Sequence, residues 1–234
     1  MSSDQEYKFD PKFDWWTPSH YDNYEYIKRE FQGKEGLRFL EVGIFEGRST
    51  VWFVENIFLA DKCRYIAVEP DPAPNMAHNF DVLEAKTGIR PAVVFDYSER
   101  ALPQMIIQRY RMDFALIDGD HNAQGVLRDA VMVWEILKVG GILLFDDYEM
   151  EATDPWHYIS HKEFSEHPRA NFQHPRAAID AFLSIYRGLY EKVIDNFQVG
   201  VRKTAELGAK NLDHGDNSQG ENGEGSFEYH QEKG

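Results

Sequence analysis

The sequence predicts an α/β fold in which helices cover both faces of a doubly wound, mostly parallel sheet of seven strands. Three observations predict it. Five short runs rich in Val, Ile, Leu and Phe recur without polar alternation, as buried parallel strands do. Segments with helical spacing separate these runs, and such alternation favours a parallel sheet. A final hairpin pattern adds one antiparallel strand near the edge of the sheet.

The individual elements follow from these patterns in chain order. The five parallel strands are expected at residues 38–42, 64–68, 91–95, 113–117 and 141–145. Helices are expected at residues 50–58, 74–86, 98–110, 123–137 and 175–187. The fourth of these helices carries an apolar stripe with i, i+4, i+7 spacing, which is typical of a helix that packs on a core. Residues 190–204 are expected to form two strands joined by a tight Asn–Phe–Gln connection.

Composition restricts the class of protein. The 234 residues, 42% of them hydrophobic, fit one domain with a single core. A formal net charge of −15 disfavours nucleic acid and an anionic membrane surface as partners. Cys63 is the single cysteine, so an intrachain disulfide is excluded and a reducing compartment is favoured. No apolar run approaches the about 18 residues of a membrane span, and no signal peptide is apparent, so we expect a cytoplasmic protein.

The main domain is expected to span residues 36–205. Residues 1–35 form an aromatic-rich extension that is expected to pack on the core, with a substrate wall or a subunit contact as the alternative. Within the domain, residues 149–174 have no clear period and are interpreted as a lid or substrate segment. Residues 206–234 hold six glycines and seven acids with almost no aliphatic residues, which predicts disorder.

Each of the five predicted parallel strands ends in an acid or a glycine turn. In a doubly wound sheet, ligands bind beyond the carboxyl ends of the strands, at the point where the strand order reverses. The residues at these ends are Glu41 to Gly47, Glu69, Asp96 to Ser98, Asp118 to His121, and Asp146 with Asp147. The pattern therefore predicts a ligand site at this edge of the sheet.

The first strand end, within the stretch RFLEVGIFEGRST, fits a nucleotide-binding turn only in part. Gly43 and Gly47 have the spacing G-x-x-x-G, whereas the dinucleotide fingerprint is G-x-G-x-x-G. These glycines would let a ligand approach the backbone and the free N–H groups of the next helix, and Ser49 or Thr50 would supply a hydroxyl. An ordinary strand–helix turn is the alternative interpretation.

Glu69 ends the second predicted strand and points to a ribose. An acid at this position accepts hydrogen bonds from ribose hydroxyls in nucleotide-binding sheets. The shortage of basic residues around the glycine turn argues against a bound pyrophosphate. A ligand with a ribose and no phosphate fits better, and S-adenosylmethionine is such a ligand.

Several of these stretches resemble one enzyme family. FLEVGIFEGRST resembles motif I of class I S-adenosylmethionine-dependent methyltransferases, which have a Rossmann-like fold, and YIAVEPDP resembles their acidic second motif. VVFDYSERALPQM is similar to the third-motif region of the catechol O-methyltransferase group. FALIDGDHNAQGVLRDAVMVWEILKVGGILLFDDY and RAAIDAF resemble metal-dependent small-molecule O-methyltransferases, especially those that methylate macrolide sugars. The resemblance covers about residues 36 to 203.

The resemblance implies a role for each candidate residue. The implied cofactor-binding residues are Glu41, Gly43, Gly47, Ser49, Glu69, Asp96, Ser98 and Asp118. The implied ligands of one divalent cation, for which carboxylate oxygens suit Mg²⁺, are Asp118, Asp146 and Asp147. His121 falls where the family places its general base, with Asp118 as the second catalytic residue.

Plainer readings of these residues stay open. Asp120 is a further acid that would replace or supplement Asp118 as a ligand. Asp118 would otherwise cap the next helix, Asp146 and Asp147 would be loop acids, and His121 would be structural.

The sequence thus predicts an S-adenosylmethionine-dependent, divalent-metal-assisted O-methyltransferase. Its acceptor is expected to be a hydroxyl of a small molecule, such as a sugar, a phenol or a polyketide, and a homo-oligomer is left open. The alternative is a catalytically inactive cofactor-binding or protein-interaction module on the same fold. A nicotinamide oxidoreductase is disfavoured by the glycine spacing. A nucleic-acid methyltransferase is disfavoured by the net charge and by the lack of an Asn/Asp-Pro-Pro-Tyr stretch.

Overall fold

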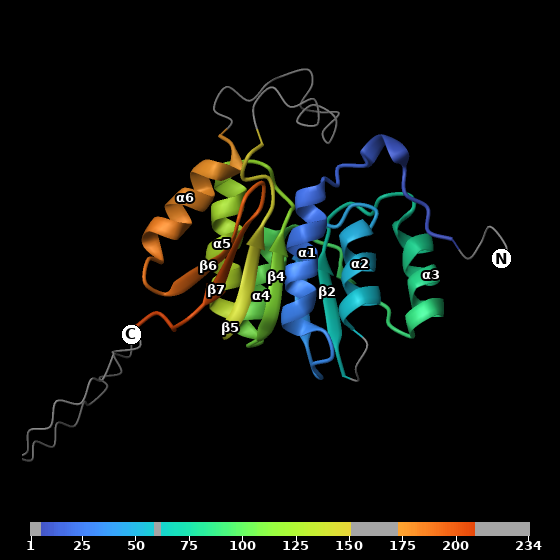
Figure 1. Cartoon of the computed structure of the whole chain (residues 1–234), viewed down its shortest axis with the longest axis horizontal. Helices are drawn as coiled ribbons and strands as arrows, with labels where there is room; N and C mark the ends of the chain where they lie inside the picture. The colour runs from blue at the N-terminus through green and yellow to red at the C-terminus, as the bar shows by residue number, and fades with distance from the viewer. Residues whose placement is uncertain (1–5, 59–61, 151–172, 209–234) are drawn as a thin grey trace, which may run out of the picture.

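The structure, a computed structural model, describes residues 6–58, 62–150 and 173–208 and contains one seven-stranded sheet (Figure 1). The strand order is β3-β2-β1-β4-β5-β7-β6. The strands are β1 (Arg38–Val42), β2 (Arg64–Val68), β3 (Ala92–Val94), β4 (Met112–Ile117), β5 (Leu137–Phe145), β6 (Tyr190–Asp195) and β7 (Val199–Lys203). The predicted fold class is confirmed.

The pairing of the strands agrees with the predicted mixture of directions. Strands β1 to β5 pair in parallel, whereas β7 pairs antiparallel with both β5 and β6. Among the described strands, β7 alone runs antiparallel to the others, and it lies one place from the edge. Residues 196–198, the predicted Asn–Phe–Gln connection, join β6 to β7.

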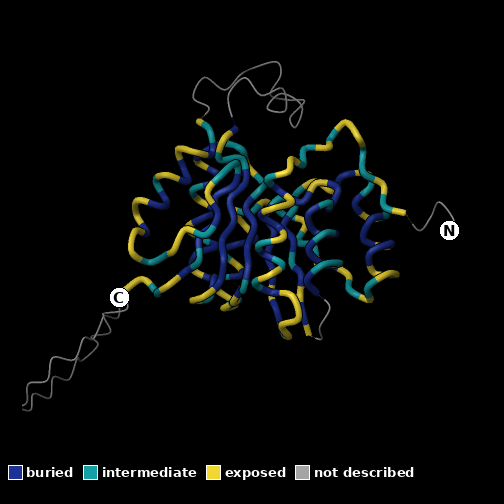
Figure 2. The backbone as a smooth tube through the Cα atoms, viewed as in Figure 1, coloured by how far each residue is buried: buried dark blue, intermediate teal, exposed yellow. Residues whose placement is uncertain are grey.

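Helices cover both faces of the sheet, as predicted. On one face lie α1 (Pro18–Phe31), α2 (Arg48–Ile57) and α3 (Met76–Thr87). On the other lie α4 (Ser98–Ile107), α5 (Ala123–Ile136) and α6 (Pro175–Ile185). The pleat of β4 sends Phe114 and Leu116 to the first layer and Ala115 and Ile117 to the second. Figure 2 shows the resulting band of buried strands in the centre of the molecule.

Helix α1 was not predicted as a helix from the sequence. Its signals are local: Pro18 stands at the first helical position, and Thr17 and His20 form a capping box. Tyr24, Ile27 and Phe31 make a buried stripe with helical spacing and pack on α2 and the sheet. The density of aromatic residues around this stripe concealed the period.

Some element boundaries also differ from the prediction. Strand β5 begins at Leu137, directly after α5, rather than at residue 141, because Leu137 is buried and pairs with Met112 of β4. Helix α2 begins at Arg48 rather than at Thr50, because Gly47 adopts a left-handed conformation at its N-cap. Both shifts follow from tertiary pairing and backbone conformation, which hydrophobic periodicity does not report.

Two predicted segments fall mostly outside the part of the chain that the structure describes. They are the lid at residues 149–174, of which 151–172 are not described, and the tail at 206–234, not described from residue 209. At the start of that predicted tail, Glu206 forms ion pairs with Lys203 at 2.7 Å and Arg111 at 2.9 Å. Among the described helices, none combines the length and the apolar character needed to cross a bilayer.

We predict that Gly43→Ala destabilises the fold far more than Gly33→Ala. Both glycines have a positive φ, +83° and +80°, so each substitution costs about 1–2 kcal/mol of backbone strain. A Cβ at Gly43 would also lie 2.2 Å from the Asp118 carbonyl oxygen, whereas one at Gly33 meets nothing within 4 Å. Urea unfolding should show a loss of at least about 3 kcal/mol for Gly43→Ala. Equal losses for the two variants would contradict the close packing described for Gly43.

Candidate active site

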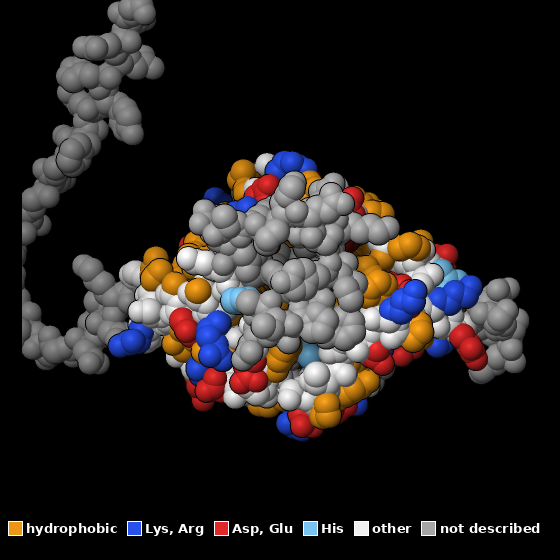
Figure 3. Space-filling view, turned by 90° about the horizontal axis from the view of Figure 1, so that it is seen from above, with side chains coloured by type: hydrophobic (Ala, Val, Ile, Leu, Met, Phe, Trp, Pro, Cys, Tyr) orange, Lys and Arg blue, Asp and Glu red, His pale blue; other side chains and the backbone are white. Residues whose placement is uncertain are grey.

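The ends of β1, β4 and β5 lie side by side where the strand order reverses. Backbone hydrogen bonds continue past the strands: the Asp118 amide donates to the Val42 carbonyl at 2.8 Å. The Asp146 amide likewise donates to the Ile117 carbonyl at 3.1 Å. The residues beyond these three strands are therefore held next to one another, at the end of the sheet where ligands bind in this fold. Figure 3 looks onto this end of the molecule, and histidine side chains are visible on it.

The two glycines of the first turn serve close packing within the protein. Gly43 lies against the backbone of Asp118 and Gly119, where a Cβ would come within 2.5 Å of the Gly119 Cα. A Cβ at Gly47 would lie 2.6 Å from the ring of Phe80. The turn therefore needs glycine at both positions in order to pack on the β4 end and on α3. Their predicted contact with a cofactor stays a prediction.

Glu69 holds the glycine turn from the end of β2. Its Oε2 accepts hydrogen bonds from the amides of Ile44 at 3.0 Å and Phe45 at 3.1 Å, and its Oε1 accepts from the Asp71 amide. A carboxylate has about four acceptor positions, so capacity remains for ribose hydroxyls. The half-buried side chain thus lies in the turn where the sequence predicts the cofactor.

Glu41 is fully buried and is surrounded by hydroxyl groups. Its carboxylate accepts hydrogen bonds from Ser49, Thr50 and, at 2.6 Å, Tyr65. Burial raises the pKa of Glu41 to about 7, and the three hydroxyl donors oppose this rise. In this arrangement Glu41 and Ser49 bind each other and fix the start of α2, and their predicted cofactor contacts stay predictions.

Asp96 and Ser98 lie at the start of α4, beyond β3. Asp96 accepts hydrogen bonds from the Tyr97 amide and the Arg100 guanidinium, and the Arg100 bond lowers the pKa of Asp96. Ser98 is half-buried, and its Oγ lies 3.4 Å from a guanidinium nitrogen of Arg128. Both residues thus stand at the strand end where the resemblance places cofactor contacts.

Asp118, His121 and Asp147 form a cluster. One ligand atom from each lies within 4.8 Å of the others. The His121 Nε2 atom is 3.9 Å from Asp118 Oδ1 and 3.3 Å from Asp147 Oδ2. Asp147 has a φ of +59°, a conformation that non-glycine residues rarely adopt and that clusters at functional sites. The fold therefore brings together three of the four residues predicted for the metal and the base.

The fourth, Asp146, contacts a residue that sequence reasoning missed. His20 of α1 places its Nε2 atom 3.4 Å from Asp146 Oδ1, and both side chains are buried. The Asp147 amide also donates to Asp146 Oδ1, at 2.8 Å. The signal that could have pointed to His20 is a histidine inside an apolar helical stripe. The pairing itself joins distant parts of the chain and is not visible in the sequence.

The electrostatics of the cluster suit a cation. Burial and the charges of Asp146 and Asp147 raise the pKa of Asp118 well above its usual range. Burial lowers the pKa of the His121 imidazole, so the neutral form that can accept a proton is favoured.

Asp120 is not part of this cluster. Its Oδ1 accepts a hydrogen bond from the Asn122 amide at 2.9 Å, and its Oδ2 lies against Gly125. The residue thus supports the turn that begins α5. This position favours Asp118 over Asp120 as the ligand.

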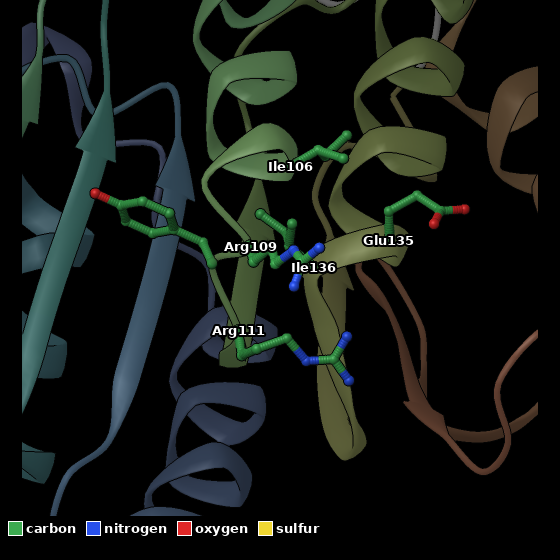
Figure 4. A pocket seen from close by; sticks show the side chains of 6 residues that line it. Ile106, Arg109, Arg111, Glu135 and Ile136 are labelled. Carbon is green, nitrogen blue, oxygen red and sulfur yellow. The ribbon is translucent and has the colours of Figure 1, made fainter.

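A shallow pocket lies at the opposite end of the molecule (Figure 4). It is found where α4 and α5 end and β4 begins, whereas the candidate site lies where those helices begin. Its lining residues are Ile106, Arg109, Tyr110, Arg111, Glu135 and Ile136. The pocket therefore contributes nothing to the candidate site.

The order and directions of the strands identify the fold as that of the class I methyltransferases. Residues 40–148, from β1 to just beyond β5, match the family model described as a methyltransferase domain. The resemblance predicted from the sequence is confirmed, since this part of the chain matches a methyltransferase domain.

The chain is also similar to solved structures and to one curated relative. The chain is similar to a putative rRNA methylase from Clostridium thermocellum, with a TM-score of 0.58 and 13% identity, covering 82% of this chain and 99% of that one. It is also similar to MycE methyltransferase of the mycinamycin biosynthetic pathway, solved with Mg and SAH, with a TM-score of 0.55 and 14% identity, covering 84% and 52%. An uncharacterized protein of Acanthamoeba polyphaga mimivirus, R132, is 27% identical over 135 residues, which are 56% of this chain and 59% of that protein.

We predict that Glu41 makes the stability of the protein depend on pH. The pKa is about 7 in the fold against 4.5 for the free side chain, so the folded state holds this proton more tightly. The stability of the wild type relative to Glu41→Gln should therefore be highest below pH 4.5 and fall as the pH rises to 7. The fall should be on the order of 3 kcal/mol. Urea unfolding of both proteins at several pH values measures it, and parallel pH curves would show that Glu41 is not responsible.

Proposed function

We propose that the protein is an S-adenosylmethionine-dependent O-methyltransferase that uses a divalent cation and acts on a hydroxyl of a small molecule. The observation that carries the proposal is the cluster of Asp118, His121 and Asp147 beside the glycine turn, at the reversal of the strand order. The methyltransferase domain match supports the methyl-transfer chemistry. The chemistry of the cluster supports oxygen as the acceptor atom, because a cation held by carboxylates binds oxygen ligands.

The residues present fit a divalent cation. Asp118 and Asp147 offer hard carboxylate oxygens that approach one another, and their mutual repulsion is of the kind that a cation relieves. Asp146 stands next to them and would supply a third carboxylate. When bound, the ion would lower the pKa of an acceptor hydroxyl and orient it.

His121 is proposed as the general base. Its imidazole reaches the same space as the two carboxylates, and burial keeps it neutral near pH 7. It would accept the proton of the acceptor hydroxyl, so that the oxygen can form a bond to the methyl carbon while the carbon–sulfur bond breaks. The protein contributes mainly positioning and electrostatic stabilisation to such a transfer.

The glycine turn and the ends of β2 and β3 are proposed to hold the cofactor. Glu69 would accept the ribose hydroxyls with the acceptor positions that the turn amides leave, and Asp96 and Ser98 would contact the adenine side. MycE, which was solved with Mg and SAH, supports this combination of cation and cofactor on the same fold.

Two other functions are less well supported. The likeness to a putative rRNA methylase suggests RNA as an alternative methyl acceptor, but a net charge of −15 opposes binding to phosphates. A catalytically inactive module would not need a neutral histidine among the acids. We therefore favour a small-molecule acceptor.

We predict that Glu69→Ala weakens the binding of S-adenosylmethionine by at least about tenfold, since two hydrogen bonds to a charged group are lost. Titration calorimetry on the full chain measures this affinity. Glu84→Ala, which removes an exposed carboxylate from α3, serves as the control and should bind like the wild type. Lack of binding by the wild type itself would refute the proposed function.

We predict that Asp147→Asn abolishes metal-dependent methyl transfer, whereas Asp120→Asn retains it. The two substitutions remove the same charge from neighbouring turns, but only Asp147 belongs to the cluster. Turnover of a panel of small hydroxylated acceptors with Mg²⁺ measures the effect, and both variants should bind S-adenosylmethionine almost like the wild type. Loss of turnover in Asp120→Asn alone would show that the ligand set is wrongly assigned.

A further inference from the structure

His20, in the first turn of α1, lies next to Asp146 at the end of β5, and it is 4% exposed. Its Nε2 atom is 3.4 Å from Asp146 Oδ1. On the other side of the ring, the Thr17 amide donates to Nδ1 at 3.1 Å, and the Thr17 hydroxyl oxygen lies 2.9 Å from the same nitrogen. The imidazole therefore bridges the start of α1 and the carboxylate of Asp146.

The contact with Thr17 determines which nitrogen of His20 carries the proton. A backbone N–H can only donate, so Nδ1 must accept from Thr17. In the neutral imidazole the proton is then on Nε2, which faces Asp146. The Nε2–H group is thus a donor whose nitrogen lies 3.4 Å from one oxygen of the carboxylate.

The position of His20 is fixed by the packing of α1. The Asn23 side chain donates to Asn196 and Gln198, both at 2.9 Å, and so attaches α1 to the turn between β6 and β7. The ring of His20 also lies 5.3 Å from that of Phe197 in the same turn. A donor on a helix held in this way imposes a definite orientation on its acceptor.

The same Asp146 oxygen receives the Asp147 amide, so two donors converge on Oδ1. Neither of these two donors engages Oδ2, the other oxygen of Asp146. His20 itself is more deeply buried than His121, whose side chain is 22% exposed. This difference separates the two histidines: His121 can reach an acceptor, whereas His20 acts through a carboxylate.

We propose that His20 is a positioning residue that holds the carboxylate of Asp146 by an Nε2–H hydrogen bond and so presents its Oδ2 to the divalent cation. The inference rests on the proposed function, because it assigns a role to His20 only if Asp146 is a ligand. Partners of this kind typically change metal affinity by about 10- to 100-fold when they are removed.

The test is Mn²⁺ binding to the full chain without acceptor, followed by electron paramagnetic resonance of the free ion. His20→Leu should weaken Mn²⁺ binding by about 10- to 100-fold. His20→Gln should restore most of it, because its side-chain amide can donate from nearly the same place as Nε2–H. His78→Leu, which alters a surface histidine on α3, should bind like the wild type. S-adenosylmethionine binding should be unchanged in all three variants.

The outcomes separate the two proposals. If the wild type binds Mn²⁺ and a folded His20→Leu binds it equally well, the role of His20 is refuted while the proposed function stands. If the wild type binds S-adenosylmethionine but no Mn²⁺, both the metal and the role of His20 are refuted. Should His20→Leu fail to fold, the nitrogen-15 spectrum of the wild-type histidines decides: an Nδ1–H tautomer at His20 would overturn the inference, and an Nε2–H tautomer would support it.

Discussion

The site depends on the close contact between the ends of β1 and β4. Gly43 donates its amide to Val68 on one side and lies against the Asp118 backbone on the other, so it fits only without a side chain. This contact brings the glycine turn next to the acids of β4 and, through the Asp146 amide, to those of β5. A cofactor site and a metal site can then share one edge of the sheet.

Carboxylates gather at the same edge, and their charges are stabilised in different ways. Glu41 is buried among three hydroxyls, and Glu69 accepts the amides of the glycine turn. Asp146 lies next to the His20 imidazole and accepts a hydrogen bond from the Asp147 amide. Asp118 lies near the charges of Asp146 and Asp147, which together with burial raise its pKa. Asp118 and Asp147, with His121, are thus the residues best placed to bind an ion.

The sequence predicts much of this architecture, because the buried strands are continuous apolar runs and their ends are marked by acids and glycines. It also places Asp118, His121 and Asp147 at one edge, since parallel strands finish together. It does not predict which partner each acid takes. Glu41 pairs with hydroxyls and Asp146 with His20, and both choices depend on side-chain packing between distant segments. Helix α1 was missed for a related reason. Aromatic residues surround its buried stripe in the sequence, and only the packing on α2 and the sheet shows which of them are buried.

The attachment of α1 to the last hairpin has a consequence for the order of folding. Asn23 and Gln198 are separated by 175 positions along the chain, and closing so long a loop is slow compared with forming the neighbouring parallel strands. The sheet from β1 to β5 can assemble while the hairpin is still absent, but α1 then lacks the contacts of Asn23 with the turn. During synthesis, the side of the site at Asp146 would therefore be completed last, after the cofactor side has already formed.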